Sequence, residues 1–316
     1  MAQDNYILVG AGAIAEQLYL KYFQSAGAGL WVCENNPGRA AELAKKFPEI
    51  HFTTEDFDVI TAKQEFKAGF ICLPNHLHAA FIRKFREKNI PVLVEKPVVA
   101  AAEDFPAAEE GGIIYVAHLR RFFDSSLFLR KLVQTGIFGA VKRVEVSDGG
   151  VFSWRLQSDY LLSREKSGGG VLMDSGIHWV DLLISVLGDI KPVHYQDNNR
   201  GGVESECALN FSFDNGSGEM RFSRIRSVKR FVRFEFEKAL YFHSLDQPDH
   251  ATITMKDFEG LEFRHRLEEN LQKAFAAQMD AFLSVLNGKS NQALLPDAGE
   301  ALKSVRFIHQ CYESKS

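Results

Sequence analysis

The first 120 residues alternate short apolar runs with segments in which apolar residues recur every three or four positions. Apolar runs lie at 6–10, 30–34, 68–74, 91–95 and 113–118, and helical patterns follow most of them. Continuous apolar strands that alternate with helices are typical of a parallel sheet covered by helices on both faces. We therefore predict that residues 1–120 form a doubly wound, Rossmann-type α/β domain.

After about residue 120, the pattern changes to an alternation of apolar and polar positions, as at 209–213, 220–222 and 232–236. Asn215-Gly216 between the first two of these runs predicts a tight hairpin. The alternation predicts a large, mostly antiparallel open sheet with one face exposed to solvent or to a partner. With late helical patterns at 271–286 and 302–308, residues 121–316 form a second α/β domain, and a C-terminal helix can pack back on the first.

Composition and charge narrow the class of protein. A chain of 316 residues is long enough for two domains, and its net charge of −4 gives no basic surface for nucleic acid. No apolar run approaches the roughly 18 residues of a membrane span, and the N-terminus lacks the features of a signal peptide. The four cysteines lie far apart, which favours reduced thiols in a cytoplasmic protein over zinc or disulfides.

The stretch VGAGAIAE places Gly10, Gly12 and Ala15 in the pattern G-x-G-x-x-A between the first strand and the first helix. The first glycine permits a tight turn, the second lets backbone approach a pyrophosphate, and the small third residue lets helix and strand pack closely. We predict that this loop, with Ala13 and Ile14, binds a dinucleotide at the helix N-terminus. The alternative is a glycine turn without a ligand.

Glu34 ends the second predicted strand, 22 residues after Gly12. A carboxylate at this position can accept a hydrogen bond from an adenosine ribose and would repel a 2′-phosphate. Asn35 follows Glu34 where an arginine would favour NADP, so the sequence favours NAD over NADP. Arg39, a few residues further, is the one feature that favours NADP.

Ligands of open α/β sheets bind outside the carboxyl ends of the strands. Two polar segments follow predicted strands, and from them we assign the remaining cofactor contacts to Leu73, Pro74, Asn75, His78, Glu95 and Lys96. Lys96 can donate to a substrate hydroxyl or carbonyl, or steer a proton. The alternative for Lys96 is a surface ion pair, but Pro97 restricts the backbone beside it and favours a fixed direction.

The segment SGGGVLMDSGIHWVDLL contains a second candidate group. If the residues after the glycines are helical, Asp174 and His178 lie at i and i+4 on one face. A carboxylate beside a histidine can orient the ring and raise its basicity. His178 and Asp181 could also suggest a metal site, but nothing nearby completes one, so we predict no metal. The alternative for Asp174 and His178 is a capping acid and a core histidine.

These motifs together resemble the Gfo/Idh/MocA oxidoreductases. The resemblance rests on G-x-G-x-x-A, the acid that ends the second strand, P-x-x-x-H at 74–78, E-K-P at 95–97 and GGG-x-x-x-D-x-G-x-H-x-x-D at 168–181. It extends to the closing segments FAAQMDAFLSVLNGK and PDAGEALKSVRFIHQCYES. It implies a Rossmann domain and a C-terminal domain whose open sheet forms a homodimer or homotetramer.

The resemblance also implies roles for individual residues. Lys96, Asp174 and His178 match the family's catalytic residues, and the proline of E-K-P is often cis. Trp154-Arg155 resembles a W-R pair near the nicotinamide or substrate, and Arg121 resembles an arginine just after the crossover between the domains. We therefore assign Lys96, Arg121, Trp154, Arg155, Asp174 and His178 to substrate binding. For Arg121, Trp154 and Arg155, a packing or surface role is an equal alternative.

The sequence thus predicts an NAD-dependent enzyme that transfers a hydride to or from a hydroxyl or carbonyl group, with Lys96 and His178 as acid and base. The expected substrate is a sugar, a polyol or a nucleotide-sugar. Arg224 and Arg226 could reach a phosphate or carboxylate of the last, and the alternative is that they lie on a solvated face. Two alternatives remain open. One is glycosidase-type chemistry with transient oxidation by NAD, and the other is a non-catalytic NAD-binding protein.

Overall fold

The computed structural model describes residues 4–105, 113–151, 159–288 and 294–315. The chain divides into two compact units, each built from segments that are far apart in the sequence. The first contains the described residues of Met1–His118, Arg155–Tyr160 and Phe275–Leu302, and the second contains those of Leu119–Trp154, Leu161–Ala274 and Lys303–Ser316.

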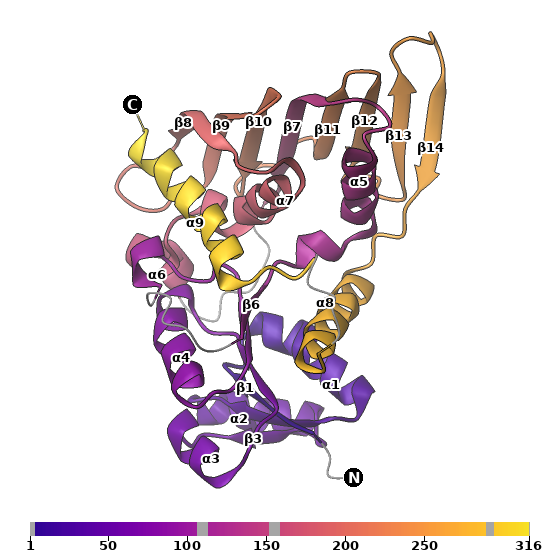
Figure 1. Ribbon diagram of the computed structural model, residues 1–316. Helices are drawn as coiled ribbons and strands as arrows, with labels where there is room; N and C mark the ends of the chain where they lie inside the picture. Colours follow the sequence, from indigo (N-terminus) through magenta and orange to yellow (C-terminus); the bar gives the residue numbers. More distant parts are fainter. Residues whose placement is uncertain (1–3, 106–112, 152–158, 289–293, 316) are drawn as a thin grey trace. The chain divides into compact units, whose positions relative to one another are not determined.

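The first unit is built on a six-stranded parallel sheet (Figure 1). Its strands, in spatial order, are β3 (His51–Thr53), β2 (Gly29–Cys33), β1 (Asn5–Val9), β4 (Ala68–Ile71), β5 (Val92–Glu95) and β6 (Ile114–Ala117). This is the order of a doubly wound dinucleotide-binding sheet, so the predicted fold class is confirmed. The strands are buried on both faces, which explains their continuous apolar runs. Strand β3 was not predicted because its three residues are exposed or half-buried and form no such run.

Helices connect the parallel strands of the first unit. They are η1 (Ala15–Tyr19), α1 (Leu20–Ala26), α2 (Pro37–Lys46), α3 (Phe57–Lys63), α4 (Asn75–Glu87) and η2 (Ala102–Asp104). One further helix, α8 (Leu271–Leu286), comes much later in the chain and lies mostly in this unit. Helix α2 begins where the Asn36 side chain accepts a hydrogen bond from the Arg39 amide at 3.1 Å, with Pro37 in its first turn. This cap fixes the point at which the chain leaves β2, which matters for the site below.

Helix α8 completes the core of the first unit, although it lies near the end of the chain. Phe275 packs edge-on against Tyr19 with ring centroids 4.8 Å apart, and Phe282 packs against Phe70 at 5.8 Å. Both phenylalanines are buried. The predicted apolar spacing of this helix therefore marks a face that covers the parallel sheet and the first helix.

The second unit is built on an eight-stranded mixed sheet. Its strands, in spatial order, are β14 (Glu262–Arg266), β13 (His250–Met255), β12 (Ala239–Ser244), β11 (Phe231–Phe236), β7 (Val141–Gly149), β10 (Gly216–Ser223), β9 (Glu206–Phe213) and β8 (Lys191–Asp197). All neighbours are antiparallel except β7 and β10. The predicted hairpin joins β9 to β10, but its two loop residues are Asp214 and Asn215, because Gly216 is already paired with Phe213.

Helices cover one face of this mixed sheet (Figure 1). The helices that belong wholly or partly to this unit are η3 (Leu119–Phe122), α5 (Asp124–Thr135), η4 (Tyr160–Leu162), α6 (Arg164–Ser167), η5 (Leu172–Gly176), α7 (Ile177–Leu187) and α9 (Ala298–Glu313). Phe211, Met220 and Phe234 are buried beneath them. On the alternate positions, Arg143 and Arg233 both donate to Glu145. The second face of the sheet therefore carries charged pairs rather than a core.

One helical run of the described chain, Arg164–Leu187, is long and apolar enough to cross a membrane. However, 67% of its most apolar window is buried inside the protein. A buried core helix meets the same criteria of length and composition, so the run is weak evidence for a membrane span.

Candidate dinucleotide and substrate site

The loop between β1 and the first helix has the geometry of a phosphate-binding turn. Gly10 has a φ of +89°, and a Cβ there would lie 2.5 Å from the carbonyl oxygen of Cys72, so only glycine fits. A Cβ on Gly12 would meet no atom within 4 Å, which leaves that side of the loop open. The first hydrogen bond of the helix runs from the Glu16 amide to the Gly12 carbonyl at 3.1 Å. The amides before it lie at a helix N-terminus, which favours anions.

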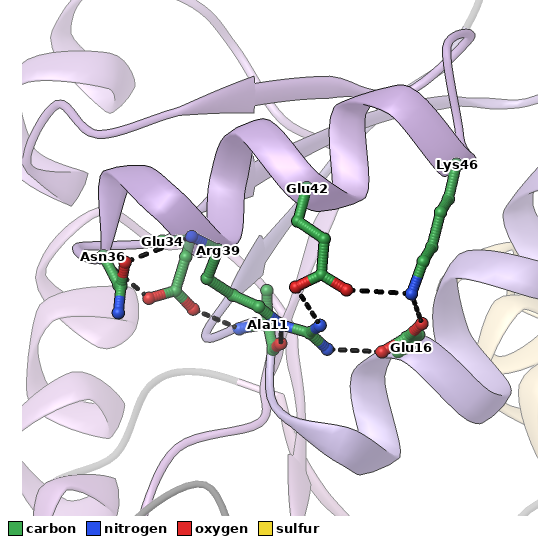
Figure 2. A network of polar contacts seen from close by, with 7 residues as sticks. All are labelled: Ala11, Glu16, Glu34, Asn36, Arg39, Glu42 and Lys46. Atoms are coloured by element: carbon green, nitrogen blue, oxygen red, sulfur yellow. Dashed lines mark hydrogen bonds and ion pairs between the residues drawn. The ribbon is translucent and has the colours of Figure 1, made fainter.

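Glu34 holds the loop from the end of β2. Its Oε2 accepts a hydrogen bond from the Ala11 amide at 2.9 Å, and its Oε1 accepts one from the Asn36 amide at 2.9 Å (Figure 2). A carboxylate oxygen has two lone pairs, so each oxygen of Glu34 can still accept a hydrogen bond from a hydroxyl group. An open glycine turn with a carboxylate fixed beside it fits the phosphates and the adenosine ribose of a dinucleotide.

Arg39 lies on the other side of Ala11. Its Nε donates to the Ala11 carbonyl at 3.1 Å, and its two terminal nitrogens donate to Glu16 and Glu42 (Figure 2). Lys46 donates to the same two carboxylates at 2.9 Å each. Bonds from Lys46 and Arg39 hold the pKa of Glu16 below its usual value. This network was not predicted, although the spacing of Glu42 to Arg39 and Lys46 on one helix was a visible signal.

His78 connects the loops that follow β4 and β5. It is fully buried, with its Nδ1 2.8 Å from the Pro97 carbonyl oxygen and its Nε2 2.8 Å from that of Leu73. Burial lowers the pKa of the imidazole, against the effect of the carbonyls. His78 therefore positions the segment that carries Lys96, and the Lys96–Pro97 peptide bond is cis.

The other residues assigned to the cofactor lie at the same strand ends. Pro74 precedes α4, and Asn75, its first residue, is buried. Glu95 ends β5, and its Oε1 accepts a hydrogen bond from the Tyr19 hydroxyl at 2.9 Å. Burial raises the pKa of the Glu95 carboxyl. The sequence assigned Glu95 to the cofactor, and this contact supports a second role in which Glu95 anchors the loop. Tyr19 was not predicted from the sequence, where it has the spacing of a core residue.

In the second unit, Asp174 and His178 lie on one helical run, but not on a regular α-helix. Asp174 lies within the π-helical turn η5, and His178 is the second residue of α7. Such turns are rare and frequently occur at functional sites. Arg224, which follows β10, donates to Oδ2 of Asp174. Arg224 therefore has an intramolecular carboxylate partner, as does Arg226, which donates to Glu206.

The glycine run before this turn is explained by two residues that were not predicted. A Cβ on Gly170 would lie 1.9 Å from the carbonyl oxygen of Glu204, and one on Gly169 would lie 2.1 Å from the Tyr312 hydroxyl. The buried Glu204 carboxylate accepts hydrogen bonds from the amides of Gly170 (2.8 Å) and Leu172 (3.0 Å) and from the Tyr312 hydroxyl (2.8 Å). Glu204 therefore fixes the start of the helical run that carries Asp174 and His178.

We expect Glu204→Ala to lower the free energy of unfolding by about 2–4 kcal/mol, because buried amide and hydroxyl donors lose their acceptor. Chemical denaturation followed by circular dichroism measures this change. Glu259→Ala, at an exposed position, is the matched control and should change stability by less than about 0.5 kcal/mol. Equal stability of the two variants would contradict the assigned role of Glu204.

Arg121 is buried in a two-point ion pair. Its Nε and one terminal nitrogen each donate to an oxygen of Asp181 at 2.7 Å, and both side chains are 1% exposed. This burial favours the packing alternative for Arg121 over substrate binding. It also gives Asp181 a cation as partner. Among the described residues, no three histidine, cysteine or acidic side chains are grouped to hold a metal ion.

The assigned residues are distributed over both units. Lys96 belongs to the first unit, and Asp174 and His178 belong to the second, so the convergence of the three on one substrate stays a prediction. Trp154 and Arg155 lie outside the described residues.

A doubly wound parallel sheet with a glycine turn and an acid at the end of its second strand defines a dinucleotide-binding protein of the Rossmann class. The family described as "Oxidoreductase family, NAD-binding Rossmann fold" matches residues 5–111, and the "GFO/IDH/MocA C-terminal domain" matches residues 127–237. The chain therefore belongs to the Gfo/Idh/MocA oxidoreductase family, as the sequence motifs indicated.

Individual relatives are distant. A 2,7-anhydro-N-acetylneuraminate hydratase of Escherichia coli (strain K12) is 24% identical over 59% of this chain and 50% of its own length. The NAD(+)-dependent scyllo-inositol 2-dehydrogenase of Bacillus subtilis (strain 168) is 22% identical over 82% of this chain and 79% of its own. The chain thus spans about half the length of some curated relatives.

A solved levoglucosan dehydrogenase in complex with NADH and levoglucosan superimposes with a TM-score of 0.84. The superposition covers 99% of this chain and 97% of that one at 18% identity. At this identity, the similarity shows that the fold is shared.

Proposed function

We propose that this protein is an NAD-dependent oxidoreductase that acts on a CH–OH or carbonyl group of a sugar, a polyol or a nucleotide-sugar. The observation that carries the proposal is the open Gly10–Gly12 turn with the Glu34 carboxylate fixed to the amide of Ala11. The remaining cofactor contacts are assigned to Ala13, Ile14, Leu73, Pro74, Asn75 and Lys96, while His78 and Glu95 hold the loops that carry these residues. A bound nicotinamide dinucleotide supplies the hydride acceptor or donor.

The residues of the chain transfer the proton and stabilise the negative charge on the substrate oxygen. Lys96, at the carboxyl end of β5, donates to the substrate oxygen and stabilises the negative charge that develops there. His178 accepts the hydroxyl proton as general base in the oxidation direction and returns it in reduction. Asp174 orients His178 or binds a neighbouring hydroxyl group, and its Arg224 partner holds the carboxylate in place.

Binding of NADH and NADPH to the purified protein tests the first part of the proposal, by quenching of tryptophan fluorescence during titration. We expect NADH to bind at least about tenfold more tightly, because Glu34 repels a 2′-phosphate. NADH-coupled assays over sugars, inositols and nucleotide-sugars then test the reaction. Failure to bind either dinucleotide would reject the proposal, and binding without turnover of any compound would favour the non-catalytic alternative.

A second candidate function is supported by the relatives that are named hydratases. A hydratase reaction has no net oxidation, so a nicotinamide cofactor would be oxidised and reduced within one turnover, as in the glycosidase-type alternative. Product that forms with enzyme-bound NAD and without accumulation of NADH would support this candidate. Stoichiometric NADH would support the dehydrogenase.

The oligomeric state and location are part of the same proposal. The face of the mixed sheet that carries the ion pairs of Arg143, Glu145 and Arg233 lies opposite the face that the helices cover, which supports a homodimer or homotetramer through this sheet. We also propose a cytoplasmic location, on the basis of the widely spaced, reduced cysteines. Light scattering after size-exclusion chromatography measures the oligomeric state.

A further inference from the structure

We propose that Glu16 and Glu42 form a clamp that withholds Arg39 from the cofactor, and that this clamp, together with Glu34, excludes NADP. The inference rests on the proposed function, because it concerns selectivity at the same dinucleotide site. Named relatives include both NAD(+)- and NADP(+)-dependent scyllo-inositol 2-dehydrogenases. Family membership therefore does not fix the cofactor, and the residues of each chain must decide it.

Ala11 shows how close Arg39 lies to the residue that selects the ribose. Its amide donates to Glu34 at 2.9 Å, and its carbonyl accepts from Nε of Arg39 at 3.1 Å (Figure 2). The two side chains therefore hold opposite ends of one residue of the phosphate loop. In this fold, an arginine near the acid of the second strand is the group that accommodates a 2′-phosphate. Arg39 has the position for that role.

The clamp directs the Arg39 guanidinium toward Glu16 and Glu42 and away from a 2′-phosphate. Its two terminal nitrogens donate to Glu16 and Glu42, and the side chain is only 12% exposed. Burial lowers the pKa of Arg39, but its bonds to the two carboxylates outweigh burial and raise it. A 2′-phosphate would have to break charge-assisted bonds that are already formed, and these are among the stronger hydrogen bonds in proteins.

Lys46 closes the clamp. It donates to both Glu16 and Glu42, so two cations and two carboxylates form a ring without net charge (Figure 2). With Arg39 neutralised in this way, the charge that remains beside the ribose position is the carboxylate of Glu34. A 2′-phosphate would meet that negative charge without a free guanidinium to balance it. The clamp and Glu34 therefore both favour NAD over NADP.

Two sets of substitutions separate the contribution of Glu34 to the exclusion of NADP from that of the clamp. Glu34→Ser removes the repelling carboxylate, and E16Q/E42Q replaces the two charged acceptors of Arg39 by weaker neutral ones of the same size. We expect Glu34→Ser alone to raise NADPH affinity less than about tenfold. Combined with E16Q/E42Q, it should raise the affinity at least about tenfold further, because the more weakly held guanidinium can pair with the phosphate. Titration of tryptophan fluorescence measures both dissociation constants, without the need for a substrate.

Arg39→Met in the triple variant is the decisive control, because it keeps the apolar stem and removes the charge. It should abolish the gain in the ratio of NADPH to NADH affinity, a ratio that cancels any equal weakening of both dinucleotides by loss of the Arg39 bond to the Ala11 carbonyl. Glu55→Gln, which breaks the exposed pair of Glu55 with Lys63, should change neither affinity. Thermal melts identify any variant that fails to fold, in which case E16Q and E42Q are measured singly beside Glu34→Ser.

The outcomes are distinct. A gain in the ratio of NADPH to NADH affinity that survives Arg39→Met, or equal effects of E16Q/E42Q on NADH and NADPH, would overturn the clamp and leave Arg39 as a brace of the loop. In both cases, wild-type binding of NADH would still support the proposed function. Failure of the wild-type protein to bind either dinucleotide would instead overturn both proposals.

Discussion

Lys96→Ala is expected to reduce kcat at least about a hundredfold while the protein still folds and still binds NADH. The ammonium group is the proposed donor to the substrate oxygen, and loss of an acid–base group usually costs a factor of this size. Binding of NADH should persist because the phosphate loop and Glu34, which are proposed to hold the cofactor, are unchanged in this variant. The measurement is steady-state NADH formation with a substrate found in the coupled assays, together with fluorescence titration of NADH.

Lys63→Ala is a suitable control for this prediction, because Lys63 is an exposed lysine of the same unit, with its side chain 61% accessible. It should leave kcat within about twofold of the wild type. Near-normal turnover by Lys96→Ala would remove Lys96 from the proposed chemistry. We expect Lys96→Ala and His178→Ala to lower kcat by similar factors. The double variant should lose no more than either single one, because the two groups act in one step.

Asp181→Ala is expected to lower the free energy of unfolding of the second unit by about 3–5 kcal/mol. The change leaves the Arg121 guanidinium buried and without its two-point partner, and an uncompensated buried charge has a cost of this order. Urea denaturation followed by circular dichroism measures the effect, and a fall in Tm should accompany it. The exposed pair of Glu55 and Lys63 provides the comparison: Glu55→Ala should change stability by less than about 1 kcal/mol.

The double substitution R121M/D181L distinguishes a structural ion pair from a catalytic one. Apolar residues of similar volume remove both buried charges together, so we expect it to recover most of the lost stability. If the double variant also turns over substrate at the wild-type rate, Arg121 has only a packing role. A stable but inactive double variant would instead support the assignment of Arg121 to substrate binding.

The strands that could be predicted from the sequence are those with two-sided burial and some of those with alternating burial, whereas β7, β8, β12 and β13 were not predicted. Strands β1, β2, β4, β5 and β6 are continuous apolar runs because both their faces are covered, and β9 and β10 alternate because only one is. Strands β3 and β14 escaped prediction because their residues are exposed or half-buried and form no apolar run, so they are held mainly at the sheet edges by backbone pairing. Exposed edge strands leave little trace in a hydropathy pattern.

The residues of the candidate site also divide into those that could be proposed from the sequence and those that could not. Residues that stand at strand ends or in a fixed spacing, such as Gly10, Glu34 and Lys96, could be assigned from the sequence. Glu204 and Tyr312 could not, because their partners lie far along the chain: Glu204 bonds Gly170 across 34 residues and Tyr312 across 108. No local pattern records such a contact. A triplet of glycines indicates that something approaches the backbone closely, but not which side chain it is.

The place of α8 in the first unit bears on how the protein is made. A ribosome releases the N-terminal strands long before residues 275–302, yet Phe275 and Phe282 cover Tyr19 and Phe70 in the finished core. During synthesis, the nascent parallel sheet must therefore keep an uncovered apolar side until residues 271–286 have emerged. Such an intermediate is prone to aggregate and is a natural client for a chaperone.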